Sequence, residues 1–273
     1  MHDNNVKNNF EESLKQKYNA VCFDIDGTLT ENNSKKIDHR AIEMIINLLV
    51  RKIPVVFITG RGESGLKDFI SDIIDELNNH NEITEDDMKR IYVLSNDGAR
   101  LFYSSKISNE KFLNENVYLC SDDSFEHLLS IDKIVKENFN HLINERVFKV
   151  TYSKDLSNGK TVNIRIVFND LYFDLSDDIY ESLRVILKKC EYFDLSLSRG
   201  FYKGCPVIQI GTTTKDKAIQ ITEKIIGVPQ NSMIRIGDCG DLKGNDYSML
   251  NCPQGYSVDK TSGEDGKCFP IFD

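Results

Sequence analysis

The sequence predicts an α/β fold in which a doubly wound parallel sheet carries an inserted α+β module. Short apolar segments alternate with amphipathic ones over residues 18–100, and the same alternation returns over residues 211–273. This alternation is typical of parallel sheets, because each connecting helix crosses back over one face of the sheet. Residues 101–210 follow a different pattern. We therefore expect a core split into residues 18–100 and 211–273, with residues 101–210 inserted between them.

The first half of the predicted core contains strands and helices in alternation. An apolar run over residues 19–25 predicts a buried strand, and apolar residues at helical spacing follow over residues 38–52. A near-continuous apolar run over residues 53–61 predicts the next strand. Residues 64–78 and 90–99 continue the series as a helix and a strand. Strands that are apolar throughout fit burial between two layers of helices.

The second half repeats this order. Residues 213–227 predict a helix, residues 232–238 a strand, residues 241–250 a helix and residues 255–259 a short strand. The polar first segment, residues 1–17, shows no comparable pattern and is expected to form a tail.

The insert is predicted to contain hairpins and helices. Residues 145–170 alternate polar and apolar side chains on both sides of a Ser-Asn-Gly-Lys turn, which predicts two antiparallel strands. A helix over residues 176–189 and strands over residues 191–199 and 206–210 follow. A module of this kind beside a parallel-sheet core creates a crevice between domains, where ligands usually bind.

Composition and charge exclude several classes of protein. The 273 residues carry a formal charge of −9, which argues against binding to nucleic acid or to anionic membranes. No apolar run is long enough to cross a bilayer, and the N-terminal residues lack the apolar centre of a signal peptide. The seven cysteines include no C-x-x-C pair, so we expect reduced thiols and a cytoplasmic protein.

The residues that carry chemistry are predicted where strands end, which is where ligands of open parallel sheets bind. Asp24 and Asp26 follow the first strand, Thr59 follows the second and Asp238 ends a later one, while Lys215 lies at the start of a helix. Converging carboxylates repel each other unless a cation neutralises them, and Mg²⁺ prefers such oxygen ligands. With that charge cancelled, one carboxylate can attack a phosphoryl group while the other handles a proton.

The chain resembles the haloacid dehalogenase superfamily of phosphotransferases. The resemblance rests on four segments in order: DIDGTLT at residues 24–30, ITGR at residues 58–61, the lysine of TKDKAI, and the acidic GDCGDLKGND at residues 237–246. It implies a Rossmann-like core, and the insert is similar to the C2 type of cap. That cap is common in members that act on sugar phosphates, a branch that includes the Cof-type phosphatases, the trehalose phosphatases and the phosphomannomutases.

The resemblance also implies roles for the core residues. Asp24 would be the nucleophile that becomes an aspartyl-phosphate, and Asp26 would protonate the leaving oxygen and then activate water. Mg²⁺ would bind the Asp24 carboxylate, the backbone carbonyl of Asp26, and Asp238. Thr59 and Lys215 would bind the phosphoryl oxygens.

Some assignments stay open at this point. Thr59 could instead cap the following helix, and Lys217 could replace Lys215. The acidic motif of C2-capped phosphatases is a compact G-D-x-x-N-D, whereas six residues separate GD from ND here, so its second acidic member is either Asp241 or Asp246. We favour Asp246 as a metal ligand.

The predicted substrate-binding set extends beyond the motifs. Its members are Gly60, Arg61, Arg199 and Lys203. For Arg165, Arg199 and Lys203, a solvated surface charge is the competing interpretation.

These patterns predict a Mg²⁺-dependent phosphatase that hydrolyses a small phosphate monoester, with a sugar phosphate as the expected substrate. The long acidic segment is more similar to the eukaryotic-type phosphomannomutases, so a sugar phosphomutase is the alternative. A protein that binds a phosphorylated ligand without turnover is a second alternative. It has no need for both Asp24 and Asp26, and both are present. The sequence does not predict an oligomeric state.

Overall fold

The computed structural model describes residues 18–30, 36–103, 116–118, 121–154, 159–172, 174–202 and 204–271. The predicted tail, residues 1–17, and Lys203 lie outside these ranges.

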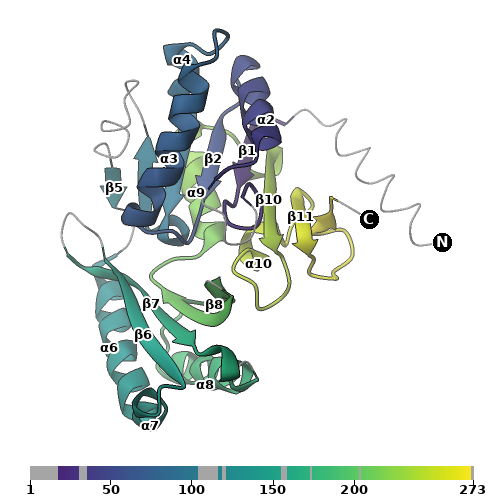
Figure 1. Ribbon diagram of the computed structural model, residues 1–273. Coiled ribbons are helices and arrows are strands. Elements are labelled where there is room, and N and C mark those ends of the chain that lie inside the picture. Colours follow the sequence, from purple (N-terminus) through teal and green to yellow (C-terminus); the bar gives the residue numbers. More distant parts are fainter. Residues whose placement is uncertain are drawn as a thin grey trace.

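The larger of two sheets is the core sheet. Its strands are β1 (Ala20–Phe23), β2 (Val55–Ile58), β3 (Ile91–Ser95), β4 (Arg100–Tyr103), β5 (Asn116–Tyr118), β10 (Met233–Cys239), β11 (Gly255–Lys260) and β12 (Phe269–Pro270). Among the described residues they pair in the order β12-β11-β10-β1-β2-β3-β4-β5 (Figure 1). All pairings in this sheet are parallel except β3–β4 and β4–β5, so among the described strands only β4 runs against the others. β1 therefore lies between strands from both halves of the predicted core, and the prediction of a split parallel sheet is confirmed.

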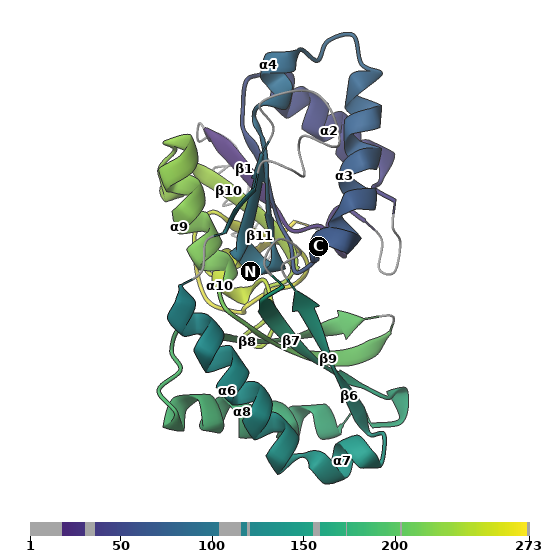
Figure 2. The same ribbon diagram turned by 90° about the vertical axis from the view of Figure 1, so that its left-hand side faces the viewer.

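Helices cover both faces of this sheet. They are α2 (His39–Val50), α3 (Glu63–Asn78), α4 (Glu85–Met88), α9 (Lys215–Ile226) and α10 (Tyr247–Leu250). Figure 2 shows α2 and α3 on one side of the sheet and α9 on the other. Side chains of β1 alternate accordingly: Val21 and Phe23 pack with α2 and α3, whereas Ala20 and Cys22 pack with α9 and α10. The apolar strand that the sequence predicted is thus buried on both faces.

The smaller sheet belongs to the inserted module. Its strands are β6 (Phe148–Lys154), β7 (Thr161–Phe168), β8 (Ser196–Tyr202) and β9 (Cys205–Gly211), paired antiparallel in the order β6-β7-β9-β8. Helices α6 (Asp122–Asn138), α7 (Asn140–Asn144) and α8 (Leu175–Lys189) lie on one side of it (Figures 1 and 2). An apolar cluster that includes Ile164, Ile166, Ile208, Ile210 and Leu183 fills the space between them. The predicted α+β insert is confirmed.

The other face of the smaller sheet is polar and lies toward the core. Thr151, Arg165, Gln209 and Ser198 are cross-strand partners in one row of that face. The Arg165 guanidinium donates a hydrogen bond of 2.6 Å to the carbonyl of Gly60, which follows β2. The insert therefore presents a polar row to the carboxyl ends of the core strands.

The start of the insert differs from the sequence prediction. The sequence placed it at residue 101, but β4 and β5 pair with β3 in the core sheet. Antiparallel strands added at the edge of a core and strands of an insert share the same period of two, so the pattern does not separate them. We propose that the inserted module comprises residues 121–210, the part that carries the smaller sheet and its helices.

No helix in the described ranges combines the length and the apolar character that crossing a bilayer requires.

The turn after β3 packs closely on the start of α9. Gly98 has φ of 100°, and a Cβ added to it would lie 2.6 Å from the Cβ of Ala218. Neither the backbone conformation nor the space admits a side chain.

We expect Gly98→Ala to destabilise the fold through both effects. Gly263→Ala is the matched control, because Gly263 also has a positive φ of 71° but open space around its Cβ position. The backbone cost is shared, so the difference reports the collision with Ala218, which should exceed about 1 kcal/mol in the free energy of unfolding. Urea denaturation measures it, and equal losses in both variants would contradict the packing described.

Candidate active site

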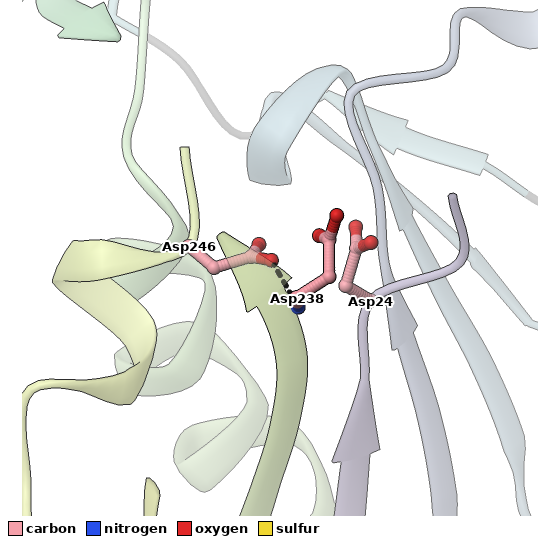
Figure 3. Close-up of side chains that lie close together, drawn as sticks. All are labelled: Asp24, Asp238 and Asp246. Atoms are coloured by element: carbon pink, nitrogen blue, oxygen red, sulfur yellow. Dashed lines mark hydrogen bonds between the residues drawn. The ribbon is translucent and has the colours of Figure 1, made fainter. Parts of the chain in front are cut away.

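Three aspartates meet at the carboxyl ends of two adjacent strands. Asp24 follows β1, Asp238 lies near the end of β10, and Asp246 directly precedes α10. β1 and β10 are parallel neighbours, which brings their ends together. One carboxylate oxygen from each aspartate lies within 4.8 Å of the others, and all three side chains are buried (Figure 3). The structure thus brings Asp246, rather than Asp241, beside the other two.

Lys215 joins this cluster from the start of α9. It is the first residue of α9, and its side chain is fully buried. Its Nζ donates hydrogen bonds of 2.6 Å to Oδ1 of Asp24 and 2.5 Å to Oδ1 of Asp246. Lys215, and not Lys217, is therefore the lysine in contact with the aspartates.

Asp246 is bonded through both of its oxygens. Its Oδ2 accepts hydrogen bonds from the backbone N–H groups of Asp238 at 3.0 Å and Cys239 at 3.2 Å (Figure 3). A Cβ added to Gly237 would lie 2.6 Å from that oxygen, so the close approach requires glycine at this position. Asp246 is held in place by β10 and in turn holds Lys215.

The three carboxyl groups of the cluster, if all are ionised, carry more negative charge than Lys215 neutralises. Burial raises the pKa of Asp24 well above its ordinary value, and the neighbouring Asp246 adds to this while Lys215 opposes it. Burial and the Asp246 charge raise the pKa of Asp238 to about 7. Burial alone would also raise the pKa of Asp246, but Lys215 and the hydrogen bonds from Asp238 and Cys239 together outweigh burial and lower that pKa. One ammonium group does not neutralise three carboxylates, and a divalent cation among these oxygens would.

Asp26 lies apart from the buried cluster. Its side chain is 58% exposed, and Arg61 donates to both of its carboxylate oxygens at distances of 2.6 to 3.1 Å. Arg61 comes from the loop after β2 and also lies 5.3 Å from the ring centre of Phe69. The structure therefore pairs two of the predicted site residues with each other at the solvent-facing edge of the site.

Thr59 and Gly60 belong to the loop between β2 and α3. Thr59 is completely buried, and its Oγ1 accepts a hydrogen bond of 3.1 Å from the Arg61 N–H. The residue that caps α3 is Gly62, without a side-chain hydrogen bond, so Thr59 does not cap that helix. The Gly60 carbonyl accepts the hydrogen bond from Arg165 of the insert.

Arg199 has a different environment from the one predicted. Its cross-strand partner is the buried Ile208, so its side chain lies on the helix-covered face of the smaller sheet. There its guanidinium forms an ion pair with Asp177 of α8 and donates a hydrogen bond of 3.1 Å to Oγ of Ser176. The structure does not bring Arg199 together with the aspartates.

The long acidic segment contacts the insert. The Arg199 N–H donates a hydrogen bond of 2.9 Å to the carbonyl of Lys243. The Lys243 Nζ lies 3.2 Å from carboxylate oxygens of both Asp177 and Glu181 on α8. Lys243, one of the six residues that separate GD from ND in this chain, thus contacts the insert.

Two residues of the interface between core and insert have no place in the sequence prediction. Asp97, in the turn after β3, is buried and accepts a hydrogen bond from the side chain of Gln209 on β9. The Asn-Asp-Gly turn was visible in the sequence, but its partner lies 112 positions away.

Comparison with known families decides the identity of the chain. The model of the haloacid dehalogenase-like hydrolases matches residues 21–259. The chain belongs to this family. The predicted resemblance is confirmed at this level, and the protein is a hydrolase. A search of curated proteins gave no match.

Several solved structures share the fold of this hydrolase. A mutant of Plasmodium falciparum IMP-nucleotidase with bound IMP has a TM-score of 0.67 at 16% identity, over 87% of this chain and 64% of that one. A haloacid dehalogenase-like hydrolase from Bacteroides thetaiotaomicron has a TM-score of 0.57 at 15% identity, over 93% and 94% of the two chains. A Streptococcus mutans UA159 protein has a TM-score of 0.59 at 16% identity, over 88% and 87%. At these identities the likeness shows the fold alone, and our chain spans less than two thirds of the nucleotidase.

The raised pKa of Asp238 predicts a pH-dependent stability of the hydrolase in the presence of a chelator. With a folded-state pKa of about 7 against an ordinary value of 3.8, the folded state keeps a proton that the unfolded state has released. This contribution favours folding at low pH and is lost as the pH rises toward 7. Asp238→Asn removes it, so the variant should gain roughly 2–4 kcal/mol relative to wild type between about pH 4 and pH 7.

Urea denaturation over this pH series measures the difference. Asp241→Asn is the control, because it removes a carboxyl of the same acidic segment that lies outside the cluster. A constant difference for Asp238→Asn would show that its carboxyl titrates normally.

Proposed function

We propose that this hydrolase is a phosphatase that releases inorganic phosphate from a small phosphate monoester through an aspartyl-phosphate on Asp24. The observation that carries the proposal is the buried contact of Asp24 with Lys215, beside Asp238, at the carboxyl end of β1. A carboxylate held in this way is positioned to attack, and the lysine offsets the charge of an approaching phosphoryl group.

The proposed reaction has two steps. An oxygen of Asp24 attacks the phosphorus, the bond from phosphorus to the ester oxygen breaks, and the leaving oxygen takes a proton from Asp26. Water then attacks the phosphorus of the aspartyl-phosphate, gives a proton to Asp26, and restores the Asp24 carboxylate as phosphate departs. Arg61 fixes the Asp26 carboxyl by contacts to both oxygens, at the edge of the site that solvent and leaving group reach. Thr59 and Lys215 would bind the phosphoryl oxygens.

The residues present fit a Mg²⁺ ion. Asp24 and Asp238 would hold it, because Asp246 already uses both oxygens for Lys215 and for the backbone of β10. We therefore propose Asp246 as a residue that positions Lys215. When bound, Mg²⁺ would neutralise the carboxylates and polarise the phosphoryl group. The backbone carbonyl of Asp26 stays a proposed ligand.

We propose a sugar phosphate as the substrate class. Support comes from the polar row Thr151, Arg165, Gln209 and Ser198, which the insert presents to the core. Such a surface offers hydrogen bonds to a polar leaving group and little burial to an apolar one. Gly60 and Arg61 line the loop between this row and Asp26.

A phosphomutase is the second candidate, because six residues separate the GD and ND pairs of the acidic segment. A mutase would return the phosphoryl group to another hydroxyl of the same sugar. Isomerised sugar phosphate without phosphate release would favour it.

Substitution of Asp24 tests the proposed function directly. Phosphate release should be measured from sugar phosphates, nucleotides including IMP, and an aryl phosphate. Asp24→Asn replaces the nucleophilic carboxylate with a neutral amide, so we expect kcat to fall by at least about a thousandfold. A chelator should abolish the wild-type activity and Mg²⁺ should restore it.

Asp241→Asn serves as the matched control, since it removes a carboxyl from the same acidic segment but outside the cluster, and it should keep near wild-type activity. Full activity of Asp24→Asn would refute the mechanism. Tight binding of a phosphate ester without turnover by the wild type would identify a binding protein instead.

A further inference from the structure

The turn after β3 holds a carboxyl group in a costly conformation. Asn96, Asp97 and Gly98 have φ values of 48°, 57° and 100°. A run of left-handed residues with side chains is rare and is maintained where the surrounding structure fixes it. Here the Asp97 N–H donates to the Thr59 carbonyl at 2.8 Å, and Gly98 packs on Ala218 in the first turn of α9. Asp97 is therefore fixed relative to both the Thr59 loop and Lys215.

Only one of the two oxygens of the Asp97 carboxyl has a hydrogen-bond partner among the described residues. Its Oδ2 accepts a hydrogen bond from the Gln209 side chain across the interface with the insert. Asp97 is only 5% exposed, and its Oδ1 is buried without a hydrogen-bond partner among the described residues. A buried carboxylate oxygen without a donor is costly, so a missing partner is expected.

The unpaired oxygen lies beside Gly60, in the loop after β2. A Cβ placed on Gly60 would lie 3.5 Å from Asp97 Oδ1 and 3.7 Å from Nε2 of Gln209, at ordinary contact distances. The Asp97 carboxyl and the Gln209 amide therefore lie directly beside Gly60. Gly60 adjoins Thr59, our proposed phosphoryl ligand, so the unpaired oxygen lies next to the expected position of the ester.

Other buried polar atoms, on β7 and in the turn after β3, also lack hydrogen-bond partners within the described residues. Asn163 lies two residues before Arg165 on β7, is fully buried, and neither atom of its amide is hydrogen-bonded within the described part of the chain. Oδ1 of Asn96, in the turn itself, is likewise unpaired there. Several buried groups with unmet hydrogen bonds at one interface indicate a polar occupant.

We propose that Asp97, oriented by Gln209, determines specificity by accepting a hydrogen bond from a hydroxyl group of the leaving alcohol, close to the ester oxygen. This inference rests on the proposed phosphatase function and adds a requirement on its substrate.

The surroundings favour a hydroxyl over other groups. Oδ1 of Asp97 needs a donor, while Gln209 Nε2, which donates one N–H to Oδ2, has a second N–H to offer an acceptor. A hydroxyl offers both, an ammonium group only donates, and an alkyl group does neither. A site built to bind a hydroxyl rejects the analogue that lacks it, because its own polar groups are then left unpaired.

The test compares three esters that differ in one hydroxyl. They are propyl phosphate, 1,2-propanediol 1-phosphate and 1,3-propanediol 1-phosphate, assayed for phosphate release with Mg²⁺. For the wild type, kcat/KM for one of the two diol esters should exceed that for propyl phosphate at least about tenfold. The diol with the larger value reports how far the hydroxyl lies from the ester oxygen.

Asp97→Gly removes the carboxyl without backbone strain, because glycine accepts a positive φ. We expect the ratio of kcat/KM between the preferred diol ester and propyl phosphate to fall toward 1. Asp97→Asn keeps an oxygen acceptor and tolerates the same φ, so its ratio should lie between the two. Gln230→Met is the control: it removes a glutamine side chain that contacts Glu223, far in sequence from this turn, and should leave the ratio unchanged.

The outcomes separate this inference from the proposed function. A wild type that hydrolyses all three esters equally, or an Asp97→Gly variant that keeps the wild-type ratio, overturns the role of Asp97 and leaves the phosphatase intact. If no phosphate is released from these esters or from the wider panel, the proposed phosphatase function is itself overturned. Thermal unfolding of each variant confirms that a changed ratio belongs to folded protein.

Discussion

The rest of the site depends on one buried ammonium group. Lys215 is fully buried, and burial of a lysine is expensive unless carboxylates compensate for it. Asp24 and Asp246 supply that compensation from two different elements, so one side chain links the start of α9, the end of β1 and the start of α10. The removal of Lys215 would leave the buried carboxylates without a compensating positive charge. This link explains why segments distant in sequence meet at one point with their carboxylates converging, a geometry that repulsion alone would oppose.

A second constraint is the division of the inserted sheet into two faces. One face is apolar and packs on α6 and α8, whereas the row with Arg165 and Gln209 is polar and meets the core. Because successive side chains of a strand point to opposite faces, a shift of one residue along the strand changes whether a side chain packs on the helices or faces the core. Arg199 and Gln209 illustrate this: Arg199 faces Asp177 on α8, and Gln209 faces Asp97 of the core.

The sequence was sufficient for the core of the site, but not for its surroundings. Asp24 and Lys215 could be placed because each lies at the end of a strongly periodic element, within a recognisable motif, and parallel strands bring such ends together. The pairing of Asp26 with Arg61 and the orientation of Arg199 depend on rotamers and strand parity, which local patterns do not encode. The helix predicted over residues 241–250 is a single turn, Tyr247–Leu250, because the residues before it form the contact with the insert.

The long acidic segment connects two parts of the molecule that a compact motif would keep separate. Lys243 is paired with Asp177 and Glu181 of the insert, and three residues later Asp246 holds Lys215. One short segment therefore contacts α8 and, through Asp246, also the lysine. The extra residues are in this way accounted for by docking of the insert, so their number does not by itself distinguish a mutase from a phosphatase. That distinction would rest on the groups that face the leaving alcohol, which in our proposal belong to the polar row of the inserted sheet.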